Sequence, residues 1–425
     1  MPFASMGLYP ALLRAIASKG YAAPTPIQVA AIPAVLAGRD VLGTAQTGSG
    51  KTAAFALPIL QRLADNVQTK PRVPQALVLV PTRELAAQVS ETFRNFEQYL
   101  PHPPHMASAL KVSTVFGGVS INPQMLGLRG GTDIVVATPG RLLDLVTHNA
   151  LSLASIKTLV LDEADRLFDL GFADELGRIL TLLPTTRQNL FFSATFPPKV
   201  EQLAQALLRD PLRIVVQPAP GITPDITQRA IAVDASRRTQ LLRHLIETNA
   251  WKQVLVFVAT QHAAEIVAEK LRKVRINAEP FHGELSQGKR TQVLADFRAS
   301  RLKVVIATDV ASRGLDVKEL PVVVNFDLPR SSVDYVHRIG RTGRAGESGM
   351  AVSFVSAATE AHFRLIQKRQ HMHLTLEHVA GFEPLEIGTV APPGSGGIKG
   401  KRPSKKDKLR SAVPDVAPAS ADELP

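Results

Sequence analysis

The chain has 425 residues, which is too long for one ordinary hydrophobic core and predicts two or three domains. Hydrophobic residues make up 45% and charged residues 20% of the sequence, so large cores can form and disorder must be local. The net charge of +12 favours a polyanionic partner such as nucleic acid, although ribosomal and membrane-surface proteins share this property. The sequence contains no cysteine, which excludes disulfides and thiolate metal sites.

The N-terminal segment and the hydropathy pattern bear on localisation. Residues 1–10 lack a charged region followed by an apolar run, and no stretch reaches about 18 uninterrupted apolar residues. The sequence therefore predicts a soluble, cytoplasmic protein without a membrane partner.

Short runs rich in Val, Ile and Leu recur along the chain with helix-like segments between them. This rhythm is typical of buried parallel strands joined by crossover helices. It occurs in the first half and restarts in the second half, which predicts two α/β lobes. The runs are residues 77–80, 134–137, 158–161 and 190–192, followed by 254–258, 304–307, 322–324 and 351–354.

A connector and a tail are expected from composition. Residues 217–224 hold three prolines and a glycine, which predicts a semi-extended link between lobes that can move. Near the end, Pro, Gly, Ser and charged residues replace the apolar pattern, which predicts a disordered tail. We therefore expect a first lobe over 1–212, a linker over 213–228, a second lobe over 229–386 and a basic tail over 387–425. The tail is expected to be a solvated arm or to add nonspecific, salt-sensitive affinity for nucleic acid.

A glycine-rich loop lies between a strand-like segment, 41–44, and a helix-like segment, 53–63. Such a loop directs backbone N–H groups at phosphates from a helix N-terminus, although a Gly/Ser-rich turn is the plain alternative. Lys51 is expected to reach the β and γ phosphates, and Thr52 to hold Mg²⁺. Ala45 departs from the general pattern, which has glycine at that position. The loop residues are Ala45, Gln46, Thr47, Gly48, Ser49, Gly50, Lys51 and Thr52.

Acidic residues come directly after the strand-like run at 158–161. The carboxyl ends of parallel strands form the ligand-binding edge of such sheets, so these acids are expected to face the phosphate loop. Asp162 is suited to anchoring Mg²⁺ through water, and Glu163 to orienting or deprotonating the attacking water. Without the loop, a solvated helix start would explain the same residues.

Together with motifs farther along the chain, these two elements resemble those of DEAD-box RNA helicases. The resemblance runs from about Phe3 to Phe354 with its motifs in the family's order. It implies two tandem RecA-like domains, ATP and Mg²⁺ as cofactors, and RNA as the substrate. The segment 381–384, with no long appended domain, resembles the compact bacterial RhlE-like subgroup.

Site residues of the first lobe are carried over from the resemblance. Gln28 is assigned to reading the adenine edge and Phe3 to stacking on the ring, which implies a preference for ATP over GTP. A frayed apolar terminus would also explain Phe3. Ser193 and Thr195 are assigned to coupling hydrolysis to strand separation. The RNA-contacting residues implied for this lobe are Pro81, Thr82, Arg83, Gly118, Thr138 and Arg141.

The second lobe supplies the remaining residues implied by the family. RNA contacts fall on Thr260, Gly283 and Thr308, whereas His282 is left out of catalysis as a structural histidine. The string 337–344 interleaves glycines with arginines, which suits phosphate recognition, although a basic surface loop would look alike. In the motif at 307–316, Gly314 is assigned to the γ-phosphate side and Asp316 to the ribose. In the string 337–344, Arg341 and Arg344 are assigned to arginine fingers, and His337 is assigned to coupling.

These assignments predict an RNA-stimulated ATPase that opens short RNA duplexes locally and with little sequence preference. If the arginine fingers reach the γ-phosphate only when the lobes close, RNA that bridges both lobes favours hydrolysis. An ATP-gated RNA clamp with incidental unwinding and a DNA translocase remain alternatives; preference for RNA over DNA separates the latter. We expect a monomer with ribonucleoprotein or ribosome-assembly partners. Residues 101–106 are interpreted as a surface loop insertion without an assigned role.

Overall fold

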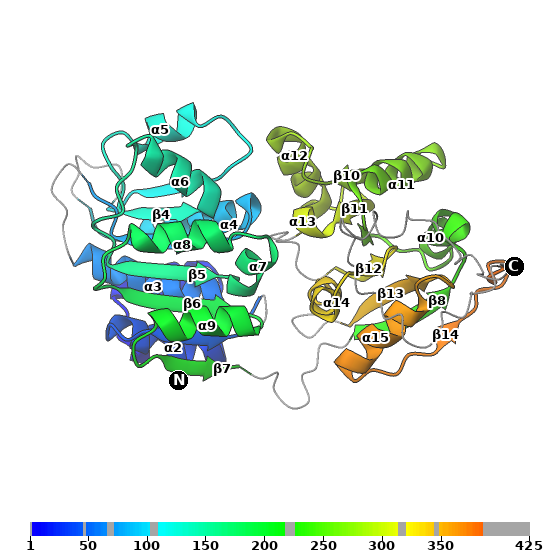
Figure 1. The fold of residues 1–425 in the computed structure, drawn as a ribbon, viewed down its shortest axis with the longest axis horizontal. Coiled ribbons are helices and arrows are strands. Elements are labelled where there is room, and N and C mark those ends of the chain that lie inside the picture. Colours follow the sequence, from blue (N-terminus) through cyan, green and yellow to red (C-terminus); the bar gives the residue numbers. More distant parts are fainter. Residues whose placement is uncertain are drawn as a thin grey trace, which may run out of the picture.

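The fold is described from a computed structural model over residues 2–45, 48–65, 72–102, 109–216, 226–312, 320–343 and 348–385. Two α/β lobes lie side by side, each built on its own sheet (Figure 1). Over the described ranges, no helix combines the length and the apolar character needed to cross a membrane.

The first lobe contains a seven-stranded parallel sheet with the order β3-β4-β2-β5-β6-β1-β7. Its strands are β1 (Val41–Thr44), β2 (Ala76–Leu79), β3 (Val112–Val115), β4 (Ile134–Ala137), β5 (Thr158–Asp162), β6 (Gln188–Ser193) and β7 (Leu212–Val215). The helical elements are η1 (Phe3–Met6), α1 (Pro10–Ser18), α2 (Pro26–Leu36), α3 (Lys51–Ala64), α4 (Arg83–Glu97), α5 (Asn122–Leu128), α6 (Pro139–Thr147), α7 (Ala164–Asp169), α8 (Ala173–Thr181) and α9 (Pro198–Leu207).

The second lobe repeats this plan with the strand order β10-β11-β9-β12-β13-β8-β14. Its strands are β8 (Ile226–Ala232), β9 (Val254–Val258), β10 (Ala278–Phe281), β11 (Val304–Thr308), β12 (Val322–Asn325), β13 (Gly349–Val355) and β14 (Leu376–Glu377). The helical elements are η2 (Ala235–Arg237), α10 (Arg238–Thr248), α11 (Gln261–Lys273), α12 (Gln287–Arg298), α13 (Asp309–Ser312), α14 (Ser332–Ile339) and α15 (Glu360–Gln370).

Both faces of the first sheet are covered by helices, and the side chains of β2 illustrate why. Ala76 and Val78 belong to the apolar core on one face, whereas Leu77 and Leu79 belong to the core on the other. Successive residues of a strand point to opposite faces, so a strand buried on both faces must be apolar at every position. This requirement explains the continuous Val, Ile and Leu runs in the sequence.

The parallel pairing of the strands brings the predicted motifs to one edge of the first sheet. All strand pairs in this sheet are parallel, so their carboxyl ends lie along the same edge. The helix α7, which comes directly after β5, lies on the side of the lobe that faces α14 of the second lobe (Figure 1). The edge that carries the predicted motifs therefore faces the other lobe.

The predicted connector is narrower than 213–228 in the structure. Strand β7 extends through Val215 and β8 begins at Ile226, so each lobe reaches into the predicted linker from its own side. The prolines of the connector lie outside the described residues. So do the predicted tail over 387–425 and most of the loop insertion over 101–106.

Candidate active site and RNA interface

The phosphate loop comes after β1 as predicted and leads directly into α3. Gly48 and Gly50 have φ angles of 83° and 90°, values that residues with a Cβ seldom adopt. The amide of Ala45 donates to the carbonyl of Ser193, which fixes the loop to the end of β6 at 3.0 Å. Lys51 is 6% exposed, and its Nζ donates to the carbonyl of Ala45 at 2.8 Å. The ammonium therefore lies inside the loop.

Gln28 joins the N-terminal segment to this loop. Its Oε1 accepts from the amide of Thr25 at 2.9 Å, and its Nε2 donates to the carbonyl of Gly50 at 3.1 Å. A primary amide has two acceptor sites and two donor hydrogens, so one of each remains for an adenine edge. Phe3 is 7% exposed within the core of the first lobe, so it is not a frayed residue. Its stacking on adenine stays a prediction.

The two acids at the end of β5 have different environments. Asp162 is 2% exposed, and burial raises its pKa to about 6, although Lys51 pulls it down. Its Oδ1 accepts from the amide of Glu163 at 3.0 Å. Glu163 has a φ of 52°, a left-handed conformation that costs a residue with a side chain about 1–2 kcal/mol. The sharp turn ends β5 and starts α7 at the edge that carries the phosphate loop.

Asp165 connects the acidic segment to the predicted coupling residues. Its amide donates to the Oγ of Ser193 at 3.2 Å. Its Oδ2 accepts from the amide of Thr195 at 3.2 Å and from the Oγ1 of Thr195 at 2.6 Å. Because Ser193 ends β6 and Asp165 comes just after β5, these bonds make the two strand ends one unit. The coupling role of Ser193 and Thr195 stays a prediction.

The predicted RNA contacts of the first lobe come together after β2, β3 and β4, which are neighbours in the sheet. Thr82 and Thr138 are the N-caps of α4 and α6. The Nη1 of Arg83 donates to the carbonyl of Gly118 at 3.4 Å. Three motifs that are well separated in the sequence thus form one continuous surface.

Arg141 adds unused donors to this surface. Its Nη2 donates to the carbonyl of Val119 at 2.7 Å. Its Nε and Nη1 are buried and have no hydrogen-bond partner among the described residues, although Nε lies 3.5 Å from Asp144. Buried donors without a partner call for an explanation, and a phosphate group would supply the missing acceptors.

The second lobe repeats this grouping at β9, β10 and β11, which also are neighbours. Thr260 is the N-cap of α11 and is exposed, and Gly283 is exposed after β10. Thr308 ends β11 and is 8% exposed. His282 lies 2.8 Å from Glu265 through its Nε2, in agreement with a structural histidine.

The arginine-rich string contains an arginine that is buried in its own lobe. Arg338 turns into its own lobe, where Nε and Nη2 lie 2.6 and 2.7 Å from the two oxygens of Asp309. Its Nη1 also donates to Asn325 at 3.1 Å. Burial, followed by the positive charge of Arg166, lowers the pKa of His337 to about 3, so this imidazole is neutral at pH 7. The positive charge of Arg341 contributes to the same shift, which places Arg341 near His337.

Two contacts between the lobes escaped the sequence analysis. The Nη1 of Arg166 lies 2.5 Å from the Oδ1 of Asp334, and the Nη2 of Arg290 lies 2.7 Å from the Oε1 of Glu84. All four side chains are at most 15% exposed. Arg166 comes directly after the acidic segment, and Glu84 lies inside the motif that holds Arg83. In the sequence, the only sign of these two ion pairs is that Arg166 and Glu84 lie beside predicted motifs.

Some predicted site residues lie outside the described part of the chain. These are Gln46 and Thr47 of the phosphate loop, and Gly314, Asp316 and Arg344 of the second lobe. Their roles stay predictions.

Comparisons with known proteins match both lobes. Residues 25–203 match the DEAD/DEAH box helicase family and residues 237–346 the helicase conserved C-terminal domain. The ATP-dependent RNA helicase DeaD of Mycobacterium tuberculosis is 42% identical over 389 residues, covering 92% of this chain and 67% of that protein. The ATP-dependent rRNA helicase rrp3 of Sclerotinia sclerotiorum is 44% identical over 356 residues, covering 83% and 71%.

A solved structure agrees with these matches. Dbp5 of S. cerevisiae, bound to RNA and ADP BeF3, aligns with a TM-score of 0.77 and 31% identity. The alignment covers 89% of this chain and 95% of that one.

The chain has two RecA-like lobes, and its phosphate loop and strand-end acids lie on the same edge of the first sheet. This arrangement defines a nucleotide-hydrolysing ATPase. The fold class predicted from sequence is therefore confirmed. The chain belongs to the DEAD/DEAH box helicase family, and the predicted enzyme, an RNA-binding, ATP-dependent RNA helicase, is confirmed with it.

Proposed function

We propose that ATP binds between the phosphate loop and the second lobe, with Mg²⁺ held at Thr52 and Asp162. Lys51, buried inside the loop, is positioned to exchange its bond to Ala45 for the β and γ phosphates. Asp162 fits a cation because it is a buried carboxylate whose pKa is raised by burial, so a bound cation would offset the cost of its negative charge. Mg²⁺ commonly uses one or two protein carboxylates together with substrate phosphates, and it would neutralise charge on those phosphates.

Hydrolysis is assigned to residues from both lobes. Glu163 orients and deprotonates the attacking water, while Arg341 and Arg344 stabilise the charge that develops on the transferred phosphate. The observation that carries this proposal is the pairing of Arg166 with Asp334. Arg166 stands one position after Asp165, and Asp334 stands seven positions before Arg341. The ion pair therefore brings the acidic turn and the arginine-bearing segment together.

RNA is proposed to run across both lobes along the edges formed by β2, β4 and β3 and by β9, β11 and β10. The grouping of small residues and helix N-caps suits contacts to a sugar-phosphate backbone rather than to bases. The unused donors of Arg141 support a phosphate contact there. Such contacts predict local unwinding with little sequence preference, and the rRNA helicases among the relatives favour a role on ribosomal RNA.

We further propose a cytoplasmic monomer of the RhlE-like subgroup. The predicted RNA contacts come from both lobes of one chain, so the proposal needs no second copy to supply a contact. Sedimentation with and without RNA measures this, and a dimer that persists without RNA would refute the monomer.

The test is steady-state ATP hydrolysis with and without single-stranded RNA, comparing wild type with Glu163→Gln. RNA should stimulate the wild type, and the variant should lose about 10² to 10⁴ in rate while still binding ATP. Glu91→Gln, which removes an exposed carboxylate on α4, is the matched control and should behave as wild type. Equal rates with and without RNA would refute gating by RNA. ATP hydrolysis without separation of a short duplex would favour the clamp.

A further inference from the structure

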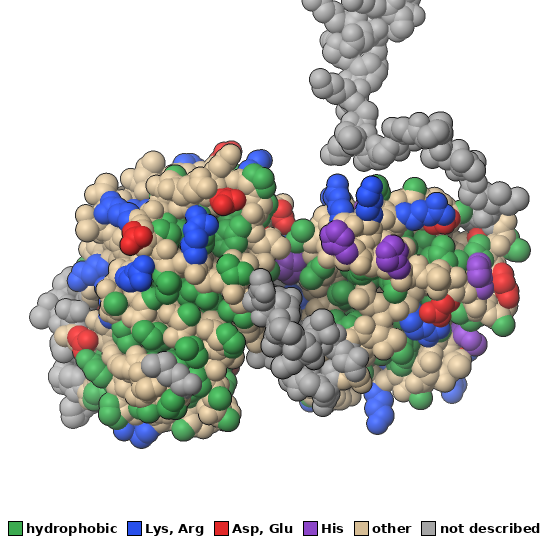
Figure 2. Space-filling view, turned by 90° about the horizontal axis from the view of Figure 1, so that it is seen from below, with side chains coloured by type: hydrophobic (Ala, Val, Ile, Leu, Met, Phe, Trp, Pro, Cys, Tyr) green, Lys and Arg blue, Asp and Glu red, His purple; other side chains and the backbone are tan. Residues whose placement is uncertain are grey.

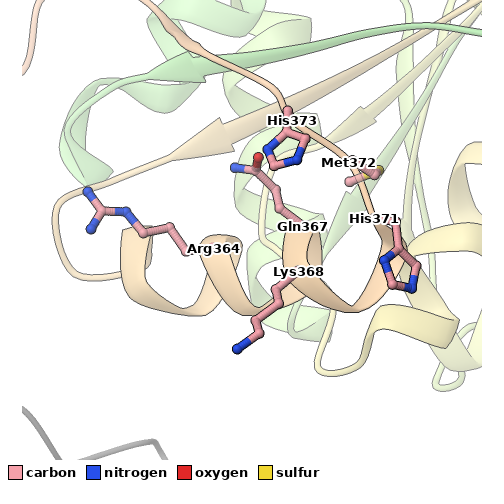
Figure 3. A pocket seen from close by; sticks show the side chains of 6 residues that line it. All are labelled: Arg364, Gln367, Lys368, His371, Met372 and His373. Carbon is pink, nitrogen blue, oxygen red and sulfur yellow. The ribbon is translucent and has the colours of Figure 1, made fainter.

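A basic hollow lies on the second lobe at the C-terminal part of α15. Arg364, Gln367 and Lys368 of α15 line it, with His371, Met372 and His373 from the turn after this helix (Figure 3). The hollow has a volume of about 420 Å³ and opens to solvent. Lys, Arg and His side chains are concentrated on the face of the second lobe seen from below (Figure 2).

The end of α15 fixes the histidines beside the helix. His371 has a φ of 51°, its amide donates to the carbonyl of Lys368 at 3.4 Å, and the amide of Met372 donates to Gln367 at 3.0 Å. This pair of bonds is the usual left-handed helix ending, which turns the chain back over the last turn. The side chains of His371 and His373 are consequently exposed next to the cations of α15.

Donors dominate the lining of the hollow. The Oε1 of Gln367 accepts from the amide of Leu374 at 3.0 Å, so the side chain turns its acceptor inward and leaves its Nε2 to donate. Lys368 is exposed, and its side chain has no hydrogen bond or ion pair within the described part of the chain. Arg364 pairs with Glu360 at 2.6 Å, but this pair is largely exposed and of the weak i,i+4 kind. No carboxylate lines the hollow.

The opposite face of α15 explains how the hollow is held. Phe363 and Ile366 are each 1% exposed and belong to a core shared with Tyr335 and Ile339 of α14. The apolar side of α15 therefore packs against α14, the helix that carries His337. The cations of α15 lie on its other, exposed side. In Figure 1, α14 lies nearer to the first lobe than α15 does.

From these observations we infer that the α15 hollow binds the phosphodiester backbone of a second RNA segment, such as the arm of the duplex that the cleft does not hold. This inference rests on the proposed RNA path across the two lobes. A lining of donors without carboxylates matches phosphate oxygens, and the net charge of +12 favours a polyanion. Phe, Tyr and Trp, the large stacking side chains, do not line the hollow, so the contact is expected to be with the backbone and independent of sequence.

An acidic protein is the other partner that a basic surface could take. Protein interfaces draw most of their affinity from buried aromatic or large apolar anchors, and Met372 is the one large apolar residue of this lining. The hollow is therefore better suited to a flexible, charged backbone than to a folded partner.

The test compares the full chain with the double variant Arg364→Ser/Lys368→Ser. Two labelled RNAs serve as probes: a single strand just long enough to cross the cleft, and the same strand joined to a hairpin duplex. The variant should bind the strand joined to the hairpin (the tailed hairpin) about tenfold more weakly than wild type does. The slope of log affinity plotted against log salt concentration should be smaller in magnitude by about two. Its affinity for the short strand, and the ATPase rate stimulated by that strand, should not change.

A matched control removes the same charge elsewhere. Arg14→Ser/Lys19→Ser takes two exposed cations from the first lobe and should bind both RNAs as wild type does. Equal binding of the tailed hairpin by the α15 variant and wild type would overturn the inference. So would loss of poly-glutamate binding with RNA binding intact, which would assign the hollow to an acidic protein. If the short strand fails to stimulate wild-type ATPase, the proposed function fails instead.

Discussion

Arg166 and Asp334 lie 168 residues apart in the sequence and form an ion pair between the lobes, with Nη1 and Oδ1 2.5 Å apart. Burial opposes the charge on Arg166, but Asp334 outweighs it, and the pKa of the guanidinium is raised. The second oxygen of Asp334 accepts from the Oγ of Ser331 at 2.8 Å. Each partner thus has a second bond within its own lobe, Asp334 to Ser331 and Arg166 to Asp169. The pair lies where the acidic turn meets α14.

Breaking this pair should impair catalysis more than folding, because each lobe keeps its own core. Asp334→Asn is expected to lower the RNA-stimulated kcat by about 10- to 100-fold, since a buried charge-assisted bond contributes about 1.5–3 kcal/mol to the closed state. Steady-state ATPase assays at saturating RNA measure the effect.

Asp169 provides the control for this prediction. It is the other partner of Arg166, at 3.0 Å, but it lies on the same helix and its side chain is 48% exposed. Asp169→Asn should leave the RNA-stimulated rate close to wild type. Equal losses in the two variants would mean that Arg166 acts within its own lobe and that the interlobe pair has no role.

Asp162 makes the stability of the first lobe depend on pH. An unfolded aspartate loses its proton near pH 4, whereas burial holds the pKa of Asp162 at about 6 in the folded protein. Between these values the folded state keeps a proton that the unfolded state has lost, so stability falls as the pH rises. The loss reaches at most about 3 kcal/mol and persists above pH 6.

Asp162→Asn should therefore stabilise the empty protein at about pH 7.5 and make no difference below about pH 4. Urea unfolding at the two pH values measures this, and Asp174→Asn, an exposed acid of α8, is the control. The same variant should lose affinity for Mg²⁺ and ATP, the usual relation between stability and function at a binding site. A gain of equal size at both pH values would point to packing instead of charge.

Sequence and structure agree where chemistry lies just beyond a strand end. The Val, Ile and Leu runs predicted the strands, and parallel pairing then placed Lys51, Asp162 and Thr138 on the same edge of the sheet. The pair of Arg166 with Asp334 could not be predicted in this way. It depends on how two separately folded lobes meet, and no local periodicity records that arrangement. Likewise, only the family resemblance, and no local pattern within the string 337–344, distinguishes Arg338, which is buried in its own lobe, from Arg341.

The two arginines of that string should separate in experiment. Arg338 is 3% exposed and bonds both oxygens of Asp309, so Arg338→Ala removes two charge-assisted bonds from a partly buried carboxylate. A loss of about 3–5 kcal/mol in the stability of the second lobe is expected. Arg341→Ala should leave stability nearly unchanged and lower RNA-stimulated hydrolysis by about 10³ to 10⁵.

Thermal melting and ATPase assays on both variants test this separation. A strongly destabilised Arg341→Ala, or a stable but inactive Arg338→Ala, would reverse the two roles. Arg243→Ala, which breaks an exposed pair with Glu247 on α10, gives the background for losing an arginine from this lobe.

Gly118 offers the sharpest test of the RNA surface in the first lobe. Its φ is 77°, and a Cβ added there would lie 2.7 Å from the Nη1 of Arg83. Because the end of a flexible side chain can move, Gly118→Ala should displace Arg83 and not unfold the lobe. The affinity for single-stranded RNA should fall by about tenfold, whereas ATP affinity without RNA should not change.

Gly130 is the matched control, because it has the same φ of 77° with nothing within 4 Å of an added Cβ. Gly130→Ala carries the same backbone strain, about 1–2 kcal/mol, without touching Arg83. Fluorescence anisotropy with labelled RNA, alongside urea unfolding, compares the two variants. If both lose RNA affinity equally, strain in the lobe is responsible; if only Gly118→Ala loses it, the position of Arg83 sets the affinity of this edge for RNA.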